Sequence, residues 1–168
     1  MSILPIRIYG DPVLRQVAVP VVVDDAVRVL AADMAETMYD APGRGLAAPQ
    51  VGVGLRMFVM DCHWKDGADR APWVVINPVM SDPSDVVAPF VEGCLSIPDI
   101  PAEVTRPTEV TMQWENLDGE VFVKRLKGFE ATCAQHEFDH LDGVMIPDRL
   151  DEAGLAAIAD RLAALETA

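Results

Sequence analysis

The hexapeptide Gln135-His136-Glu137-Phe138-Asp139-His140 decides how the rest of this chain is organised. In a helix, residues four positions apart lie one above the other on the same face. The rings of His136 and His140 can therefore reach a single metal ion, and Glu137 stands close enough to act on a molecule bound beside it. This pattern is typical of a hydrolytic metal centre. The alternative is a pair of core histidines with a solvated glutamate between them.

The residues around the hexapeptide favour a helix that begins near Gly128. Four side chains recur at i, i+4, i+7 and i+11 and so share one stripe: Phe129, Cys133, His136 and His140. Because two of them are apolar, we expect this stripe to face the core and to carry the histidines inward. Gly143 stands where the helix would end, since glycine tolerates the left-handed conformation of a C-terminal cap.

A catalytic metal of this kind usually has three protein ligands and leaves a fourth position for water. The remaining histidine, His63, is expected to be a plain loop residue, and Glu152 and Glu166 fall in or near an acidic C-terminal segment that we expect to be solvated. Thiolate is a good ligand for such metals, which leaves three cysteines as candidates: Cys62, Cys94 and Cys133. Three ligands from one straight helix cannot close around a tetrahedral ion, so we expect Cys133 to form pocket wall.

Cys94 is the better candidate for the third ligand. It stands in Glu92-Gly93-Cys94-Leu95-Ser96, directly after an apolar run at residues 86–91. A glycine beside a ligand lets the backbone approach a metal closely, and the N–H of the next residue can then point at a reacting oxygen. A buried structural cysteine is the alternative. The histidine pair, which lacks a third ligand, favours the metal-binding interpretation.

Three stretches together resemble the motifs of the peptide deformylases, in the family's order and spacing: Gly45-Leu46-Ala47-Ala48-Pro49-Gln50, Glu92-Gly93-Cys94-Leu95-Ser96 and Gln135-His136-Glu137-Phe138-Asp139-His140. The opening Ile8-Tyr9-Gly10-Asp11-Pro12-Val13-Leu14-Arg15 is similar as well, and the resemblance runs from about residue 3 to about residue 150. That family removes the formyl group from the N-terminal methionine of new bacterial and organellar proteins. We therefore expect a single deformylase-like catalytic domain over residues 1–168, with a C-terminal helix at about 151–166.

The resemblance implies a set of catalytic roles. One divalent metal ion is expected, held by Cys94, His136 and His140. Fe(II) is the expected working metal and Zn(II), Ni(II) or Co(II) can replace it, although ligand type alone predicts zinc. Glu137 is expected to take a proton from water and later to deliver it to the departing amine. The side-chain amide of Gln50 and the backbone N–H of Leu95 are expected to donate to the developing oxyanion.

The methionine side chain of such a substrate requires an apolar pocket. The residues that we predict to bind substrate are Gly45, Phe90, Phe129, Cys133 and Arg44. Two positions depart from the family's usual pattern, because Arg44 and Thr132 stand where apolar residues are usual. We expect Arg44 to turn outward, with contact to a substrate carbonyl or carboxylate as the alternative. Glu92 or Asp139 is expected to orient the histidines, with Arg106 as an ion partner.

The composition limits the cellular setting. A chain of 168 residues with 51% hydrophobic and 24% charged residues suits one ordinary globular domain. No apolar stretch is long enough to span a membrane and no signal peptide is apparent, so we expect a cytoplasmic protein. Three cysteines argue against a disulfide framework. The net charge of −14 argues against direct nucleic-acid binding, and the acidic tail does not favour ribosome docking.

The coarse pattern predicts an α+β fold in which antiparallel strands surround the central ligand-bearing helix. Short strands are expected at residues 3–8, 56–60 and 73–76, a hairpin at 110–126, and helices after Asp24 and at the C-terminus. Prolines at positions 98, 101 and 107 confine any strand there to an edge.

Three other functions remain open at this point: a deformylase-like protein with altered N-acyl-peptide specificity, a catalytically idle protein that binds N-termini on the same fold, and a peptidase with the same motif. The usual third ligands of such peptidases are missing. An idle binder would have little need for both Glu137 and Gln50.

Overall fold

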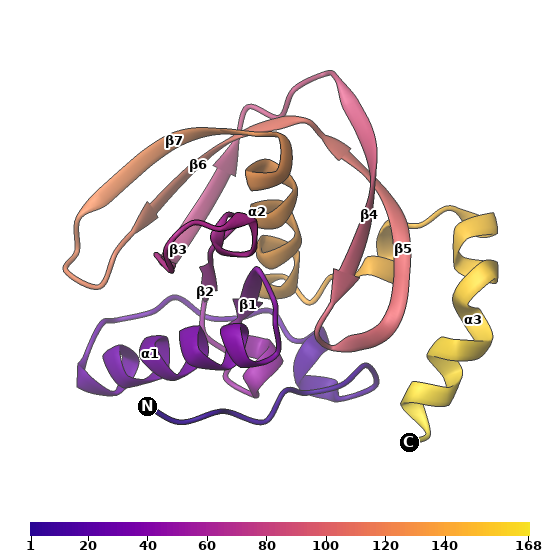
Figure 1. Ribbon diagram of the computed structural model, residues 1–168, viewed down its shortest axis with the longest axis horizontal. Coiled ribbons are helices and arrows are strands. Elements are labelled where there is room, and N and C mark those ends of the chain that lie inside the picture. The colour runs from indigo at the N-terminus through magenta and orange to yellow at the C-terminus, as the bar shows by residue number, and fades with distance from the viewer.

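A computed structural model describes residues 1–168, and it has the α+β fold that the sequence predicts (Figure 1). The helices are α1 (Asp25–Asp40), α2 (Gly128–Leu141) and α3 (Glu152–Glu166). The strands are β1 (Gly45–Ala47), β2 (Met57–Met60), β3 (Trp73–Ser81), β4 (Val87–Cys94), β5 (Ile97–Pro107), β6 (Glu109–Glu115) and β7 (Val121–Lys127). Short 3-10 helices join them, of which η2 (Ala48–Val51), η3 (Trp64–Asp66) and η4 (Ile146–Arg149) matter for the site.

Two antiparallel sheets lie on either side of α2. One has five strands in the order β1-β2-β3-β6-β7, and the other consists of β4 and β5 alone. Figure 1 shows α2 between them, with β4 and β5 on one side and the larger sheet on the other. The predicted central position of the ligand helix is therefore confirmed.

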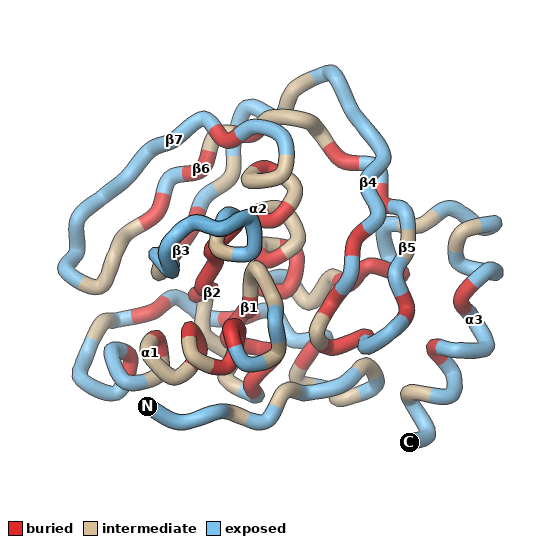
Figure 2. The backbone as a smooth tube through the Cα atoms, in the orientation of Figure 1, coloured by how far each residue is buried: buried red, intermediate tan, exposed pale blue.

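One of three hydrophobic core clusters includes the buried apolar residues of α2 and packs them against the larger sheet. Buried residues are frequent along α2 and the strands beside it, while β7 and most of α3 are exposed (Figure 2). The helix ends at Leu141, and Gly143 just beyond it has a φ of 72°, the left-handed conformation predicted for its cap. There the Val144 N–H donates to the Asp139 carbonyl at 2.9 Å, a bond that only a left-handed residue between them permits. This cap fixes the end of the helix directly after His140.

Two features of the strands bear on the site. The register of the β4–β5 pair is irregular between Glu92 and Cys94, and Cys94 pairs with Ile97 across a tight turn. This turn places the Cys94 side chain at the end of the hairpin that faces α2. β5 contains three prolines and still runs for 11 residues, because it pairs with β4 alone and its other edge needs no donors. The edge prediction is thus confirmed.

The strand predicted at residues 3–8 is wrong. The segment is extended, but its N–H groups bond singly to separate neighbours and form no ladder. Arg7 donates to the Gln50 carbonyl at 2.7 Å and Tyr9 donates to the Ser96 carbonyl at 2.8 Å. Because these acceptors lie on a 3-10 helix and in a turn, the segment has no strand to pair with. None of the helices has both the length and the hydrophobicity needed to span a lipid bilayer.

Candidate metal centre and substrate cavity

Three ligand atoms from two elements converge at one point. α2 presents His136 and His140, and the end of β4 presents Cys94. The Cys94 Sγ lies 3.4 Å from His140 Nε2, and the two Nε2 atoms lie 3.3 Å apart. All three ligand atoms fall within 4.8 Å of one another and all three residues are at least partly buried. A thiolate and two imidazole nitrogens in this arrangement fit a single divalent transition metal.

The protonation of the histidines is set by their surroundings. Burial, together with repulsion from His136, lowers the pKa of His140 well below its ordinary value. This shift favours the neutral ring, which is the form that binds metal. The His136 Nδ1 lies 3.0 Å from Glu92 Oε1, so that its Nε2 faces the ligand cluster. The Nδ1 of His140 is buried and has no hydrogen-bond partner.

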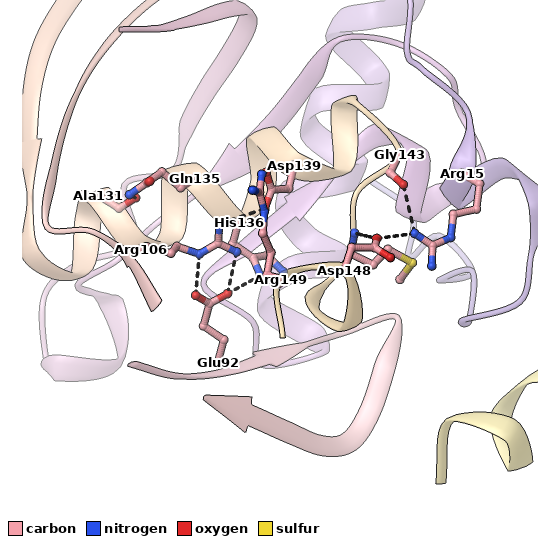
Figure 3. A network of polar contacts seen from close by, with 11 residues as sticks. Arg15, Glu92, Arg106, Ala131, Gln135, His136, Asp139, Gly143, Asp148 and Arg149 are labelled. Carbon is pink, nitrogen blue, oxygen red and sulfur yellow. Dashed lines mark hydrogen bonds and ion pairs between the residues drawn. The ribbon is translucent and has the colours of Figure 1, made fainter. Parts of the chain in front are cut away.

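An ion-pair network, buried except at Arg149, joins the ligand helix to β4, β5 and η4 (Figure 3). Arg106 donates to both oxygens of Glu92 at 2.6 and 3.0 Å and to Asp139 at 2.9 Å. Arg149, from η4, donates to both oxygens of Asp139 at 2.6 and 3.0 Å. Although burial acts to raise the pKa of Glu92, hydrogen bonds from His136 and Arg106 hold it below its ordinary value.

The two carboxylates therefore have different tasks. Glu92 contacts a histidine ligand directly, as predicted, and Arg106 is its ion partner. Asp139, itself on α2, contacts Arg106 and Arg149 rather than a histidine, so it anchors the ligand helix to β5 and η4. The contribution of Arg149 was missed by sequence reasoning, because its position gives no periodic or motif signal.

The side chain of Gln50 is held beside the ligand cluster by a hydrogen bond from the backbone of Ala47. Its Oε1 accepts a hydrogen bond from the Ala47 N–H at 2.9 Å, which fixes the orientation of the amide. The Nε2 then lies 3.6 Å from Cys94 Sγ and 3.1 Å from the Ser96 hydroxyl. Ser96 is fully buried and was not singled out in the sequence, although it follows Leu95 directly. The amide N–H groups therefore face the place where the metal ligands converge.

Glu137 is almost fully buried, and its environment shifts its acidity. Burial raises the pKa of this carboxyl group to about 7, and its Oε2 atom has no hydrogen-bond partner. The opposite wall is formed by Gly45, where an added Cβ would lie 2.3 Å from Glu137 Oε1. Only glycine leaves room for the carboxylate at this point. A carboxyl group with a pKa near neutrality can both accept and release a proton at physiological pH.

A cavity of about 560 Å³ opens in front of these residues. Every residue predicted for catalysis and substrate binding lines it, and so do the ligands Cys94 and His136, whereas His140 is not among the lining residues. Phe90 and Phe129 form its aromatic side, with ring centroids 5.6 Å apart, and Cys133 lies on the adjoining face of α2. The volume is that of a small-molecule or peptide-end site.

Arg44 does not turn outward as expected. Its guanidinium lies 5.0 Å from the centre of the Phe129 ring, in the cavity wall. Two hydrogen bonds to Asp66, each 3.0 Å long, and a further one to the Cys62 carbonyl hold it there. The expectation failed because Asp66 lies on η3, a segment that the sequence pattern leaves as an undefined polar loop.

Metal-ligand donors, a buried carboxylate and an amide donor around one cavity define a class of protein, the metal-dependent hydrolases. Comparison with known proteins then specifies the family. The family model described as "Polypeptide deformylase" matches residues 3–155, and the chain belongs to this family.

Individual relatives agree with this assignment. A peptide deformylase from Brucella suis biovar 1 is 48% identical over 153 residues, covering 90% of this chain and 87% of the relative. The crystal structure of peptide deformylase from Thermotoga maritima is similar with a TM-score of 0.84 and 41% identity, over 90% of this chain and 99% of that one. A variant of peptide deformylase 1B from Arabidopsis thaliana is similar with a TM-score of 0.93 and 37% identity, over 98% and 90% of the two chains.

Proposed function

We propose that this enzyme hydrolyses the N-formyl group from the N-terminal formyl-methionine of newly made proteins and releases formate. The observation that carries the proposal is the convergence of Cys94, His136 and His140 beside the buried carboxyl group of Glu137, in a cavity large enough for a peptide end. Membership of the deformylase family supports the same activity. The whole chain, residues 1–168, is proposed to act as one catalytic domain.

The donor set suits one divalent metal ion. We propose Fe(II) as the working metal, with Zn(II), Ni(II) or Co(II) able to replace it, because thiolate and imidazole ligands bind all four ions. When bound, the ion supplies a Lewis acid that makes water a better nucleophile and polarises the formyl carbonyl. A thiolate ligand beside Fe(II) also predicts loss of activity on oxidation.

Glu137 carries the protons in this scheme. Its carboxylate accepts a proton from the attacking water, whose oxygen forms the new bond to the formyl carbon. The same carboxyl group then donates that proton to the amine nitrogen as the carbon–nitrogen bond breaks. Formate and a free N-terminal amine leave. The raised pKa of about 7 suits both steps, because the group gains and loses a proton at little cost near neutral pH.

Two N–H donors stabilise the negative charge that develops on the formyl oxygen. The Gln50 amide is neutral and oriented before substrate arrives by the Ala47 N–H, so it stabilises charge without a change of protonation. The backbone N–H of Leu95 is proposed as the second donor, since the turn between β4 and β5 places this residue in the cavity wall. Preorganised donors of this type commonly contribute about 3 kcal/mol each to catalysis.

The substrate is held by its first side chain and its backbone. Phe90, Phe129 and Cys133 offer apolar surface for the methionine side chain. Gly45 lets the peptide end approach Glu137. One edge of β4 has no partner strand, and we propose that the peptide adds there as an extended strand, which gives binding with little dependence on sequence.

Nascent chains are the proposed partners, in the cytoplasm, without direct binding to nucleic acid. The net charge of −14 opposes phosphate binding. The acidic residues of α3 also oppose stable docking of this tail on the ribosome.

Formate release from formyl-Met-Ala-Ser by anaerobically prepared, Fe(II)-loaded protein tests the proposal, with Glu137→Ala as the comparison. We expect formate from the wild type and at least about a 100-fold lower rate in the variant. Cleavage of unformylated Met-Ala-Ser would indicate a peptidase instead. Binding of formyl-Met-Ala-Ser without any formate would indicate an idle binding protein.

A further inference from the structure

We propose that Arg44 and Thr132 are specificity-determining residues, which adapt the cavity to a first side chain that carries a neutral hydrogen-bond acceptor. Among such side chains, methionine sulfoxide is the one nearest to methionine in length. The substrate class would then include N-formyl peptides whose first methionine has been oxidised. This inference rests on the proposed deformylase activity and deepens it.

Hydrogen bonds within the chain hold Arg44 in the cavity wall. Its Nη1 donates to the Cys62 carbonyl and to Asp66 at 3.0 Å, and its Nη2 donates to Asp66 at 3.0 Å. The Nε–H and one Nη2–H are left without a partner in the chain. The guanidinium carbon lies 5.0 Å from the centre of the Phe129 ring and both residues line the cavity, so we place these donors on its aromatic side.

The backbone around Arg44 is equally fixed. Its carbonyl accepts from the Asp61 N–H at 2.9 Å and from Cys133 Sγ at 3.6 Å. The η3 segment is also held against Gly43, the residue before Arg44, because the Trp64 indole N–H donates to the Gly43 carbonyl at 3.0 Å. Arg44 therefore loses little conformational entropy when a substrate group binds to its free donors.

Thr132 supplies a second free donor on the neighbouring wall. It lies on α2 one turn before His136 and lines the cavity. Threonine in a helix often donates its hydroxyl to the carbonyl one turn back, but here the hydroxyl makes no hydrogen bond within the chain. An apolar side chain placed against Thr132 and Arg44 would remove unpartnered donors from water, which is unfavourable.

The charge of the site favours a neutral acceptor over an acidic one. Asp66 pairs with Arg44 and offsets its charge, so Arg44 attracts a substrate carboxylate less strongly than an unpaired arginine would. A sulfoxide oxygen is a strong neutral acceptor, whereas the thioether sulfur of methionine accepts weakly. The remaining methylene groups of methionine sulfoxide would still contact Phe90 and Phe129, as those of methionine would.

The test compares kcat/KM for three peptides that differ only in the first side chain: formyl-methionine sulfoxide-Ala-Ser, formyl-Met-Ala-Ser and formyl-norleucine-Ala-Ser. Norleucine has no acceptor. The proteins are the wild type, Arg44→Met, Thr132→Val and the control Arg28→Met, whose arginine lies on α1 and pairs with the exposed Asp118. Formate release is measured with the same metal content in each protein.

We expect the sulfoxide-to-norleucine ratio of kcat/KM to fall roughly fivefold or more in Arg44→Met, the effect of one net hydrogen bond, and to fall in Thr132→Val as well. Arg28→Met should keep the wild-type ratio. The inference is overturned if both cavity variants keep the wild-type ratio, and Thr132→Val, being isosteric, decides the matter if Arg44→Met fails to fold. If formyl-Met-Ala-Ser yields formate but both cavity variants keep the wild-type sulfoxide-to-norleucine ratio, only this inference is rejected. If no peptide yields formate, the proposed function is rejected.

Discussion

The closest contact in the site predicts that Gly45→Ala inactivates the enzyme without unfolding it. A Cβ at this position would lie 2.3 Å from Glu137 Oε1, 2.7 Å from Cδ and 2.8 Å from Cγ. Carbon atoms in ordinary contact are about 3.5 Å apart, so the carboxylate has to move by roughly 1 Å. The clash would otherwise be relieved only by movement of β1, and the hydrogen-bonded ladder with β2 holds β1 in place.

The magnitude follows from that displacement. A misplacement of about 1 Å in a catalytic group can cost about 100-fold in rate. The loss should fall on kcat at saturating formyl-Met-Ala-Ser, because the group that moves is the proposed proton carrier. The free energy of unfolding should fall by only about 1–3 kcal/mol, the usual cost of overpacking. Metal content should stay that of the wild type, since no ligand is touched.

The assay is formate release measured beside thermal unfolding and metal analysis, with Gly54→Ala as the matched control. An added Cβ at Gly54 meets no atom within 4 Å, and the residue has no positive φ. The control should therefore keep wild-type kcat and stability. A Gly45→Ala protein with kcat within about twofold of the wild type would refute the argument that glycine is needed to seat Glu137.

Three further predictions concern stability, pH and metal binding. Arg106→Leu removes the only arginine partner of the buried Glu92 and one of the two arginine partners of the buried Asp139, and should lower the free energy of unfolding by about 3–5 kcal/mol in denaturant titrations; an unchanged midpoint would contradict the network. Asp61 is buried, which acts to raise its pKa, but a tyrosine hydroxyl and backbone N–H groups hold that pKa below its ordinary value. Because the folded pKa is the lower one, the stability from Asp61 is present above about pH 4 and is lost as pH falls further. Asp61→Asn should therefore flatten the fall in stability below about pH 4, and an identical acid transition would count against it. Cys94→Ser should reduce the metal bound per chain and make the protein release it to weaker chelators; full metal content in that variant would exclude Cys94 as a ligand.

Much of the site was accessible from local sequence. The α2 histidines share a face because of their spacing, and Gly143 ends the helix through its backbone freedom. Both effects act within a few residues and need no knowledge of the fold. The approach of Cys94 to the histidines was predicted from ligand chemistry and the family resemblance, and the structure brings these residues together.

The features that the sequence did not reveal depend on distant partners. Arg44 lies in the cavity wall because Asp66, 22 residues later, captures its guanidinium. Residues 3–8 form no strand because their acceptors come from a 3-10 helix and a turn. Pairings of this kind depend on where loops are brought by the whole fold, which side-chain periodicity does not encode.

The central claim is that Glu137 and the metal ligands together remove a formyl group. It is tested most directly by product analysis of formyl-Met-Ala-Ser after incubation with metal-loaded wild type or Glu137→Gln. The account predicts equal amounts of formate and free Met-Ala-Ser from the wild type, and a rate lower by about 100-fold or more in a variant with unchanged metal content. Equal rates in the two proteins, or no formate from metal-loaded wild type, would contradict it.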